Sequence, residues 1–171
     1  MGKLNIQEKN NCCGCGACLN ACPCEAIAMK ADFEGFSYPD IDENRCIACG
    51  LCGNICPVLN PVPEKPFSQR CFIVQHSDKN ILAESTSGGA FTGLAESILG
   101  KGGVVFGAAF DENFKVQHRY IEKSAKLGSF RNSKYVQSDT GGSFRQAKTF
   151  LDAGRHVLFS GAPCQIALCA V

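Results

Sequence analysis

The chain has 171 residues, of which 45% are hydrophobic, and a formal net charge of +1. This length allows one ordinary domain, or a small domain with part of another. The apolar fraction excludes a disordered chain, and the near-neutral charge argues against nucleic acid as a partner. No stretch is apolar over the roughly 18 residues that a membrane span needs, and the first ten residues lack a secretory core. We therefore expect a cytoplasmic protein whose thirteen cysteines serve metal or redox chemistry rather than structural disulfides.

Eight of the cysteines form an internal repeat. The first copy reads Cys-x-x-Cys-x-x-Cys-x-x-x-Cys-Pro from Cys12, and the second has the same spacing from Cys46, 34 positions later. In bacterial ferredoxins with this run, each half supplies three cysteines to one [4Fe–4S] cluster and its fourth to the other. The repeat therefore predicts two crossed ligand sets, Cys12, Cys15, Cys18 and Cys56 for cluster one, and Cys46, Cys49, Cys52 and Cys22 for cluster two.

Zinc and disulfides explain this pattern less well. Zinc modules use two Cys-x-x-Cys pairs for each ion rather than three cysteines and a distant fourth, and disulfides need an oxidising compartment. Cys13 and Cys24 lie outside the repeat. Cys13 is either a ligand in a shifted register or, like Cys24, a small loop residue, and the second reading is favoured because only Cys12 keeps the spacing of 34.

Between the two halves, residues 26–41 predict a small hairpin around Gly35 that covers the clusters. Four prolines then follow in residues 57–67 and indicate a linker. We expect a ferredoxin-like α+β dicluster domain over residues 1–60, a Pro-rich linker over 61–70 and the first part of an α/β domain over 71–171.

The remaining residues alternate between strand and helix patterns. We expect strands at 71–77, 104–110 and 156–160, with a hairpin partner at 114–121. One helix is expected to bury Phe91, Leu94, Ala95 and Ile98, with a cap from Ser85, Thr86 or Ser87 and an end at Gly100. A second is expected to bury Phe144, Ala147, Phe150 and Leu151 and to end at Gly154. Cys71 and Cys169 lie in apolar runs and are expected in the core, and the three histidines are expected to be structural.

Two segments of this region are candidate sites. Residues 86–89, Thr-Ser-Gly-Gly, precede a helix and suit an anion such as phosphate, although an ordinary capped and closely packed helix explains them as well. Cys164 follows a strand and is expected in the first turn of a helix, where the dipole lowers a thiol pKa. In this position Cys164 is expected to be a ligand, a redox thiol or a neighbour of a flavin. The alternative is that it is only a small apolar residue in a tight turn.

Four segments together resemble the coenzyme F-420 hydrogenase/dehydrogenase beta-subunit family. They are the cysteine repeat, "STSGGAFTGLAESILGKGGVVFGAAFD", "SKYVQSD" and "VLFSGAPCQIA", where Ala162 replaces the threonine usual in the family. The resemblance implies an iron–sulfur flavoprotein of greater length, in which FAD exchanges electrons between the clusters and a hydride carrier such as the deazaflavin coenzyme F-420. Carried onto this chain, it implies a catalytic role for Cys164. It also implies flavin or substrate contacts at Ser87, Gly88, Gly89, Lys134, Tyr135 and Cys164.

The expected function is thus that of an oxidoreductase subunit with two [4Fe–4S] clusters and FAD, serving a redox partner protein or subunit and a small hydride carrier. The alternative is a ferredoxin-type module that docks to a redox partner and catalyses nothing itself. A non-catalytic remnant is a third reading, which the intact repeat of eight cysteines disfavours.

Overall fold

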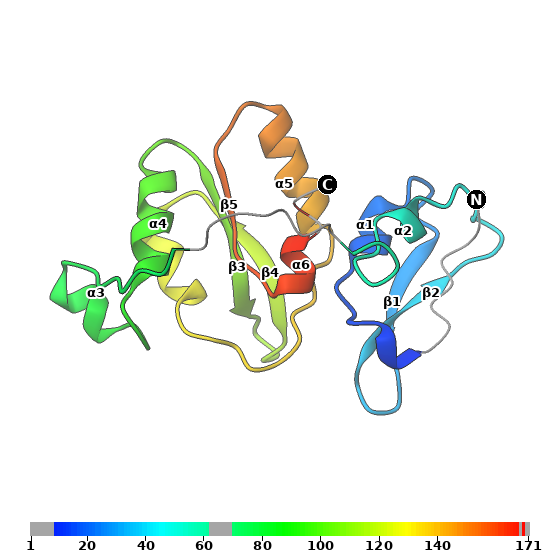
Figure 1. Cartoon of the computed structure of the whole chain (residues 1–171), viewed down its shortest axis with the longest axis horizontal. Coiled ribbons are helices and arrows are strands. Elements are labelled where there is room, and N and C mark those ends of the chain that lie inside the picture. The colour runs from blue at the N-terminus through cyan, green and yellow to red at the C-terminus, as the bar shows by residue number, and fades with distance from the viewer. Residues whose placement is uncertain (1–8, 62–69, 168, 170–171) are drawn as a thin grey trace. The chain divides into compact units, whose positions relative to one another are not determined.

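The computed structural model describes residues 9–61, 70–167 and 169 (Figure 1). The chain forms two units. The first contains the described residues of Met1–Pro63 together with those of Asp139–Phe144 and Gly161–Val171, and the second contains those of Glu64–Ser138 and Arg145–Ser160. Most of the predicted linker, residues 62–69, lies outside the described residues. Two short segments from the later part of the chain therefore pack with the N-terminal unit.

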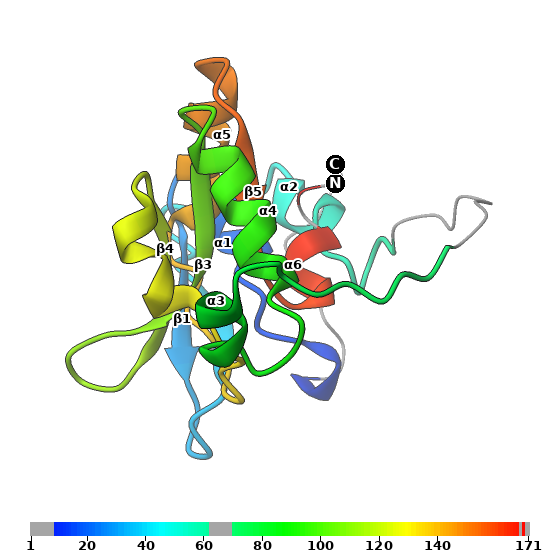
Figure 2. The same ribbon diagram turned by 90° about the vertical axis from the view of Figure 1, so that its left-hand side faces the viewer.

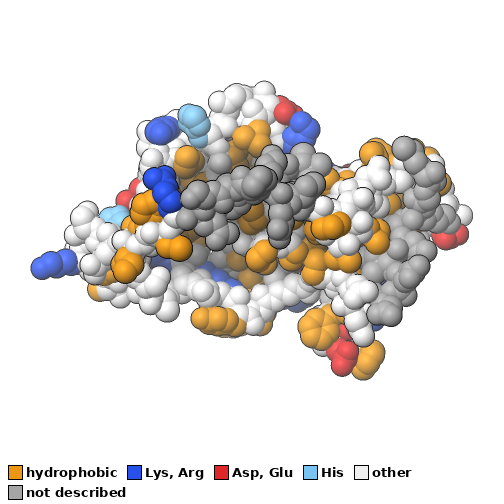
Figure 3. Space-filling view, in the orientation of Figure 1, with side chains coloured by type: hydrophobic (Ala, Val, Ile, Leu, Met, Phe, Trp, Pro, Cys, Tyr) orange, Lys and Arg blue, Asp and Glu red, His pale blue; other side chains and the backbone are white. Residues whose placement is uncertain are grey.

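The first unit is built from short elements around one antiparallel hairpin. Ile27 pairs with Ile41 and Ala31 with Ser37, and Gly35 in the turn has a φ of 90°, so the hairpin predicted over residues 26–41 is confirmed. Phe33 and Phe36 are exposed in this turn, where Figure 3 shows projecting hydrophobic side chains at the lower right. The elements are η1 (Lys9–Asn11), α1 (Ala17–Ala21), β1 (Ile27–Ala31), β2 (Ser37–Ile41), α2 (Leu51–Asn54) and α6 (Pro163–Ala167).

The sequence repeat is also a repeat of backbone conformation. Gly16 and Gly50, 34 positions apart, both precede a short helix in the left-handed conformation, with φ of 75° and 77°. Gly14 and Ala48, also 34 apart, have φ of 59° and 53°. The two cysteine loops therefore follow the same path, because equivalent positions accept the same left-handed turns.

The second unit contains a three-stranded sheet in the order β4-β3-β5. β3 pairs antiparallel with β4 and parallel with β5, so the strands predicted at 104–110, 114–121 and 156–160 are confirmed within two residues at each end. The elements of this unit are α3 (Lys79–Ala83), α4 (Ala90–Leu99), β3 (Val104–Phe110), β4 (Val116–Ile121), η2 (Ser124–Phe130), α5 (Ser143–Asp152, whose first two residues group with the first unit) and β5 (Val157–Phe159).

Helices cover both faces of this sheet, with α4 and α5 on opposite sides in Figures 1 and 2. Val105 and Ala109 of β3 pack with α4 and η2 in one cluster. Val104 and Phe106 pack with Ala147 of α5 in the other. Alternate side chains of β3 thus enter opposite cores, which explains why its sequence is a continuous apolar run.

Three expectations for this unit were wrong. Residues 71–77 form no strand, and Phe72, Ile73 and Val74 are exposed. The backbone N–H of His76 instead donates to the carbonyl oxygen of Gly88, just before α4. Leu94 and Leu151 are also exposed, because the buried faces of α4 and α5 are narrower than the apolar stripes. Finally, the N-cap of α4 is Gly89 in the left-handed conformation, and no side chain caps the helix.

Phe106 lies at the centre of an aromatic cluster and is fully buried. Its ring centroid is 5.4–6.2 Å from those of Tyr120, Phe150 and Phe159. We expect Phe106→Ala to lower the free energy of unfolding of the second unit by about 3–5 kcal/mol, because the change leaves a cavity in a packed core. Denaturant unfolding measures this loss, and Phe114→Ala, the same deletion at an 86% exposed side chain, is expected to leave the midpoint unchanged. Equal losses in both variants would contradict the assigned core.

Among the described residues, no helix has both the length and the apolar character needed to cross a bilayer.

Candidate functional site

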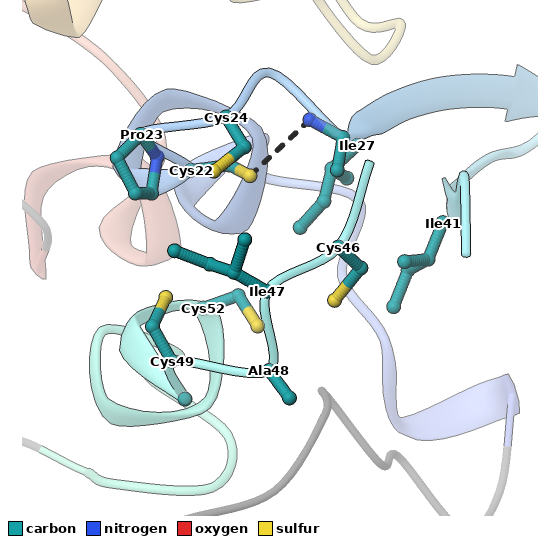
Figure 4. Close-up of a pocket in the computed structure, with 12 residues that line it drawn as sticks. Cys22, Pro23, Cys24, Ile27, Ile41, Cys46, Ile47, Ala48, Cys49 and Cys52 are labelled. Atoms are coloured by element: carbon teal, nitrogen blue, oxygen red, sulfur yellow. Dashed lines mark hydrogen bonds between the residues drawn. The ribbon is translucent and has the colours of Figure 1, made fainter. Parts of the chain in front are cut away.

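Two cavities in the first unit collect the eight cysteines of the repeat into two groups of four. The cavities measure about 320 and 370 Å³ including their open mouths. Cys13 also borders the first cavity and Cys24 the second. In each group three cysteines come from one half of the repeat and one from the other. The first group is Cys12, Cys15, Cys18 and Cys56, and the second, shown in Figure 4, is Cys22, Cys46, Cys49 and Cys52.

Apolar side chains complete both walls. Met29 and Pro39 from the hairpin border the first cavity, and Ile27 and Ile41 from the same hairpin border the second. Figure 4 shows Ile41 on one side of the second cavity and Ile47 among its cysteines. The hairpin therefore borders both cavities and contributes apolar side chains to both walls.

Burial makes the first cavity a poor place for a bare thiolate. It raises the pKa of the Cys15 and Cys18 thiols to about 12 and also raises that of Cys12. A backbone N–H directed at each sulfur partly opposes this effect, and the donors belong to Gly14, Ala17 and Leu19. Bound iron would replace the thiol protons, because the thiolate is the form that binds metal.

The second cavity contains a similar contact. The backbone N–H of Ala26 donates to Cys22 Sγ at 3.3 Å, drawn as the dashed line in Figure 4. Hydrogen bonds of this kind stabilise added negative charge on sulfur and so raise the reduction potential of an iron–sulfur cluster.

The arrangement suits a cluster rather than a single ion. Within the described ranges, no three His, Cys, Asp or Glu side chains converge closely enough to hold one metal ion. A [4Fe–4S] cubane needs a different ligand arrangement, because each of its four irons binds one thiolate. The four sulfur ligands therefore surround the whole cluster instead of meeting at one ion. All thirteen cysteines lie in the described part of the chain, and no disulfide joins any of them.

Residues 139–144 hold the first cysteine loop in place, which the sequence analysis did not foresee. Thr140 Oγ1 donates to the carbonyl oxygen of Cys15 at 3.2 Å, and Asn20 Nδ2 donates to the carbonyl oxygen of Gly141 at 2.8 Å. Thr140 is buried and fills the space where a Cβ on Gly16 would stand. No local pattern signals this contact, because it joins residues more than a hundred positions apart.

Gly16→Ala is therefore expected to disturb the first cavity. Its left-handed backbone costs an alanine about 1–2 kcal/mol, and the new Cβ would collide with Thr140 Oγ1. We expect weaker retention of the iron held by the first group of cysteines, measured as iron content after gel filtration. The matched control is Gly53→Ala, where nothing lies within 4 Å of the new Cβ. Iron loss from the control alone would contradict this account.

Comparison with protein-family models decides the nature of the N-terminal unit. Residues 11–60 match the model of the 4Fe-4S dicluster domain. These residues form a ferredoxin-type 4Fe-4S dicluster domain. Two [4Fe–4S] clusters follow from the domain and its cysteines. No curated protein matches the chain.

The candidate flavin residues other than Cys164 lie in the second unit. Gly88 packs so closely against Val74 that a Cβ would collide with its carbonyl oxygen, and a Cβ on Gly89 would lie 3.1 Å from His76 Cβ. Ser87 is exposed. The two glycines thus serve close packing of residues 74–76 against the start of α4, which was the alternative reading of this loop.

The segment that carries Lys134 and Tyr135 contacts that loop, since Thr86 Oγ1 donates to Asn132 Oδ1 at 2.6 Å. Lys134 Nζ donates to three carbonyl oxygens of its own segment at 2.6–3.1 Å, those of Ser129, Arg131 and Asn132. Burial lowers the pKa of this lysine. Tyr135 is 93% exposed. Lys134 is therefore held by carbonyl groups of its own segment.

Cys164 lies in the first turn of α6, as predicted, but the expected effect on its acidity is wrong. Burial, followed by the neighbouring Cys13, raises the pKa of the Cys164 thiol more than the nearby backbone N–H groups lower it. A helix of five residues supplies little dipole. Because Cys13 contributes to this pKa, Cys164 lies near the first cysteine loop.

The structure also tests the roles predicted for Cys71, Cys169 and His118. Cys71 and Cys169 are exposed, so their assignment to the core was wrong, because residues 71–77 form no strand and Cys169 lies beyond α6. His118 is buried on β4, where its Nε2 lies 2.9 Å from the carbonyl oxygen of Ser160 and its ring stacks on Phe159. These contacts support the structural role expected for this histidine.

Proposed function

We propose that this protein is a one-electron carrier in which the two groups of cysteines hold one [4Fe–4S] cluster each. The single observation that carries the proposal is the division of the eight cysteines between two cavities, with one ligand crossing from each half of the repeat. Each cluster, when bound, takes up and releases one electron. The ligand sets are Cys12, Cys15, Cys18 and Cys56 for cluster one, and Cys46, Cys49, Cys52 and Cys22 for cluster two.

The chain's own residues set the conditions for this transfer. The cysteine thiolates bind, the hairpin side chains Ile27, Met29 and Ile41 limit access of water, and backbone N–H groups at the sulfurs favour the reduced state. Electrons pass to and from a redox partner protein or subunit. No group in the dicluster domain makes or breaks a bond during the transfer.

A flavoprotein oxidoreductase is the second proposal. It is supported by the likeness of residues 85–111, 133–139 and 157–167 to the coenzyme F-420 hydrogenase/dehydrogenase beta-subunit family, with FAD and a deazaflavin or similar hydride carrier. Gly88 and Gly89 pack closely against other residues, and Lys134 Nζ donates to a carbonyl oxygen of its own segment.

One preparation separates the two proposals. We expect the anaerobically purified chain, reconstituted with iron, sulfide and FAD, to contain about eight irons per chain and to reduce a one-electron acceptor such as cytochrome c. Bound FAD and turnover with a deazaflavin or nicotinamide would favour the flavoprotein. Fewer than about five irons per chain would contradict both.

A further inference from the structure

The two halves of the repeat share a backbone path but differ in what packs against them. Ala17 and Asn20 are three residues apart on α1 and therefore lie on the same side of that helix. Ala17 is only 1% exposed, and Asn20 Nδ2 donates to the carbonyl oxygen of Gly141 at 2.8 Å. Thr140, from the same turn as Gly141, packs against the loop that leads into α1. Residues 139–144 therefore occupy this side of the first half.

The equivalent side of the second half is exposed and more apolar. Leu51 and Asn54 of α2 follow Ala17 and Asn20 by 34 positions. Leu51 is 46% exposed, and Ile47, which borders the second cavity, is 66% exposed. Within the ranges that the structure describes, the Asn54 side chain is exposed and forms no hydrogen bond. We call the surface formed by Ile47, Leu51 and Asn54 the α2 face.

The dicluster domain is acidic, and part of its negative charge lies beside the second cavity. Residues 9–61 contain six acidic and three basic residues, which gives a net charge of −3. Two oxidised clusters with their thiolates would add about −2 each. Glu25 and Asp42 are exposed, and each is next in sequence to a residue of the cavity wall. A protein that binds here is therefore favoured by positive charge at the rim of its contact surface.

We propose that the α2 face is the docking surface of the redox partner protein, and that electrons enter and leave the domain through cluster two. This inference rests on the proposed function, because the clusters must hold the electrons. The partner is a one-electron redox protein whose contact surface is apolar at its centre and carries lysines and arginines at its rim.

The first half of the repeat shows how such a surface is covered. There the turn of residues 139–144 supplies a hydroxyl group that donates to the carbonyl oxygen of Cys15, and a carbonyl oxygen that accepts from Asn20. The chain itself thus occupies that side of the first half and leaves the matching side of the second half exposed. A partner that binds the α2 face buries Ile47 and Leu51, and it can satisfy the amide of Asn54 as the turn satisfies that of Asn20.

Cytochrome c is the probe, because it is a basic protein that accepts one electron. That electron reduces its ferric haem to the ferrous state, and no bond forms or breaks. Leu51→Lys removes an apolar side chain from the α2 face and places a positive charge against a basic partner. We expect the bimolecular rate constant for reduction of cytochrome c by the reduced holoprotein to fall about tenfold or more at low ionic strength. Reduction of ferricyanide, a small acceptor that needs no docking surface, is expected not to slow.

Leu59→Lys is the matched control. Leu59 is 40% exposed and follows Val58, which borders the first cavity, so the variant makes the same change beside the other cluster. Its rate with cytochrome c is expected to stay close to that of the wild type. Asn54→Lys makes a second change in the α2 face and is expected to slow the reaction as Leu51→Lys does. Hydrogen exchange of the wild-type holoprotein with excess ferricytochrome c is expected to slow at the amides of α2 and not at those of α1.

Iron content separates the possible failures. Chains with about eight irons that reduce cytochrome c equally fast in the wild type, Leu51→Lys and Asn54→Lys would overturn the docking surface and leave the proposed function intact. A loss of rate as large in Leu59→Lys would do the same. Protection of α2 that rises with the concentration of the protein alone would mean that a second copy of this chain covers the face, which also overturns the inference. Wild-type protein with about eight irons that does not reduce cytochrome c would overturn the inference and the proposed function together.

Discussion

Cys22→Ser is expected to damage cluster two, which the later half of the repeat holds, and to spare cluster one, which contains the neighbouring Cys18. Cys22 belongs to the first half of the repeat but borders the same cavity as Cys46, Cys49 and Cys52 of the second half. We expect the iron content to fall from about eight to about four per chain, or to about seven if a three-iron cluster survives. EPR of the reduced protein measures which of the two signals is lost.

Cys56→Ser is the complementary variant and is expected to remove the other signal, since Cys56 borders the first cavity. Cys71→Ser serves as the control, with both signals and all the iron retained. Loss of the same signal from Cys22→Ser and Cys18→Ser would mean that each half of the repeat holds its own cluster, and the crossed assignment would be wrong.

Removal of both clusters is expected to unfold the dicluster domain while the second unit stays folded. The buried hydrophobic residues of the domain are few and small, and two of them, Cys18 and Cys56, are ligands of cluster one under the proposal. A domain with so little core depends on its metal for stability, and structural metal centres commonly contribute about 10 kcal/mol or more to folding. Chelation after acid release of the iron gives the apo form.

Hydrogen exchange measures the outcome in each unit. We expect the amides of β1 and β2 to lose protection in the apo protein, whereas those of β3 keep theirs because both faces of that strand are buried. The Phe106→Ala variant is expected to show the opposite pattern, with the iron retained and the protection of β3 reduced. Continued protection of β1 in the iron-free protein would contradict the dependence on the clusters.

The sequence was sufficient where the structure depends on local spacing. The repeat offset of 34 residues reappears as matching left-handed turns at Gly16 and Gly50. The continuous apolar run of residues 104–110 became the central strand of the sheet. Both features depend on residues that are close together in the sequence. Cysteine spacing and hydrophobic patterning describe such residues directly.

The sequence was insufficient where tertiary contacts decide. The apolar residues 71–77 resemble a strand, but this segment bonds to Gly88 before α4 instead of joining the sheet. Lys134 resembles an anion ligand, but three carbonyl oxygens of its own segment accept hydrogen bonds from its ammonium group. Thr140 packs against Gly16 and Cys164 lies near Cys13, although more than a hundred positions separate the members of each pair. Such pairs leave no local pattern, so a single sequence does not reveal them.

The central claim is that each half of the repeat lends one cysteine to the cluster of the other half. Anomalous diffraction at the iron edge from a crystal of the anaerobically purified protein tests it most directly. The account predicts two groups of about four irons, one bonded to Cys12, Cys15, Cys18 and Cys56 and the other to Cys22, Cys46, Cys49 and Cys52. An absorption edge from zinc, or a cluster bonded only to cysteines of a single half, would contradict it.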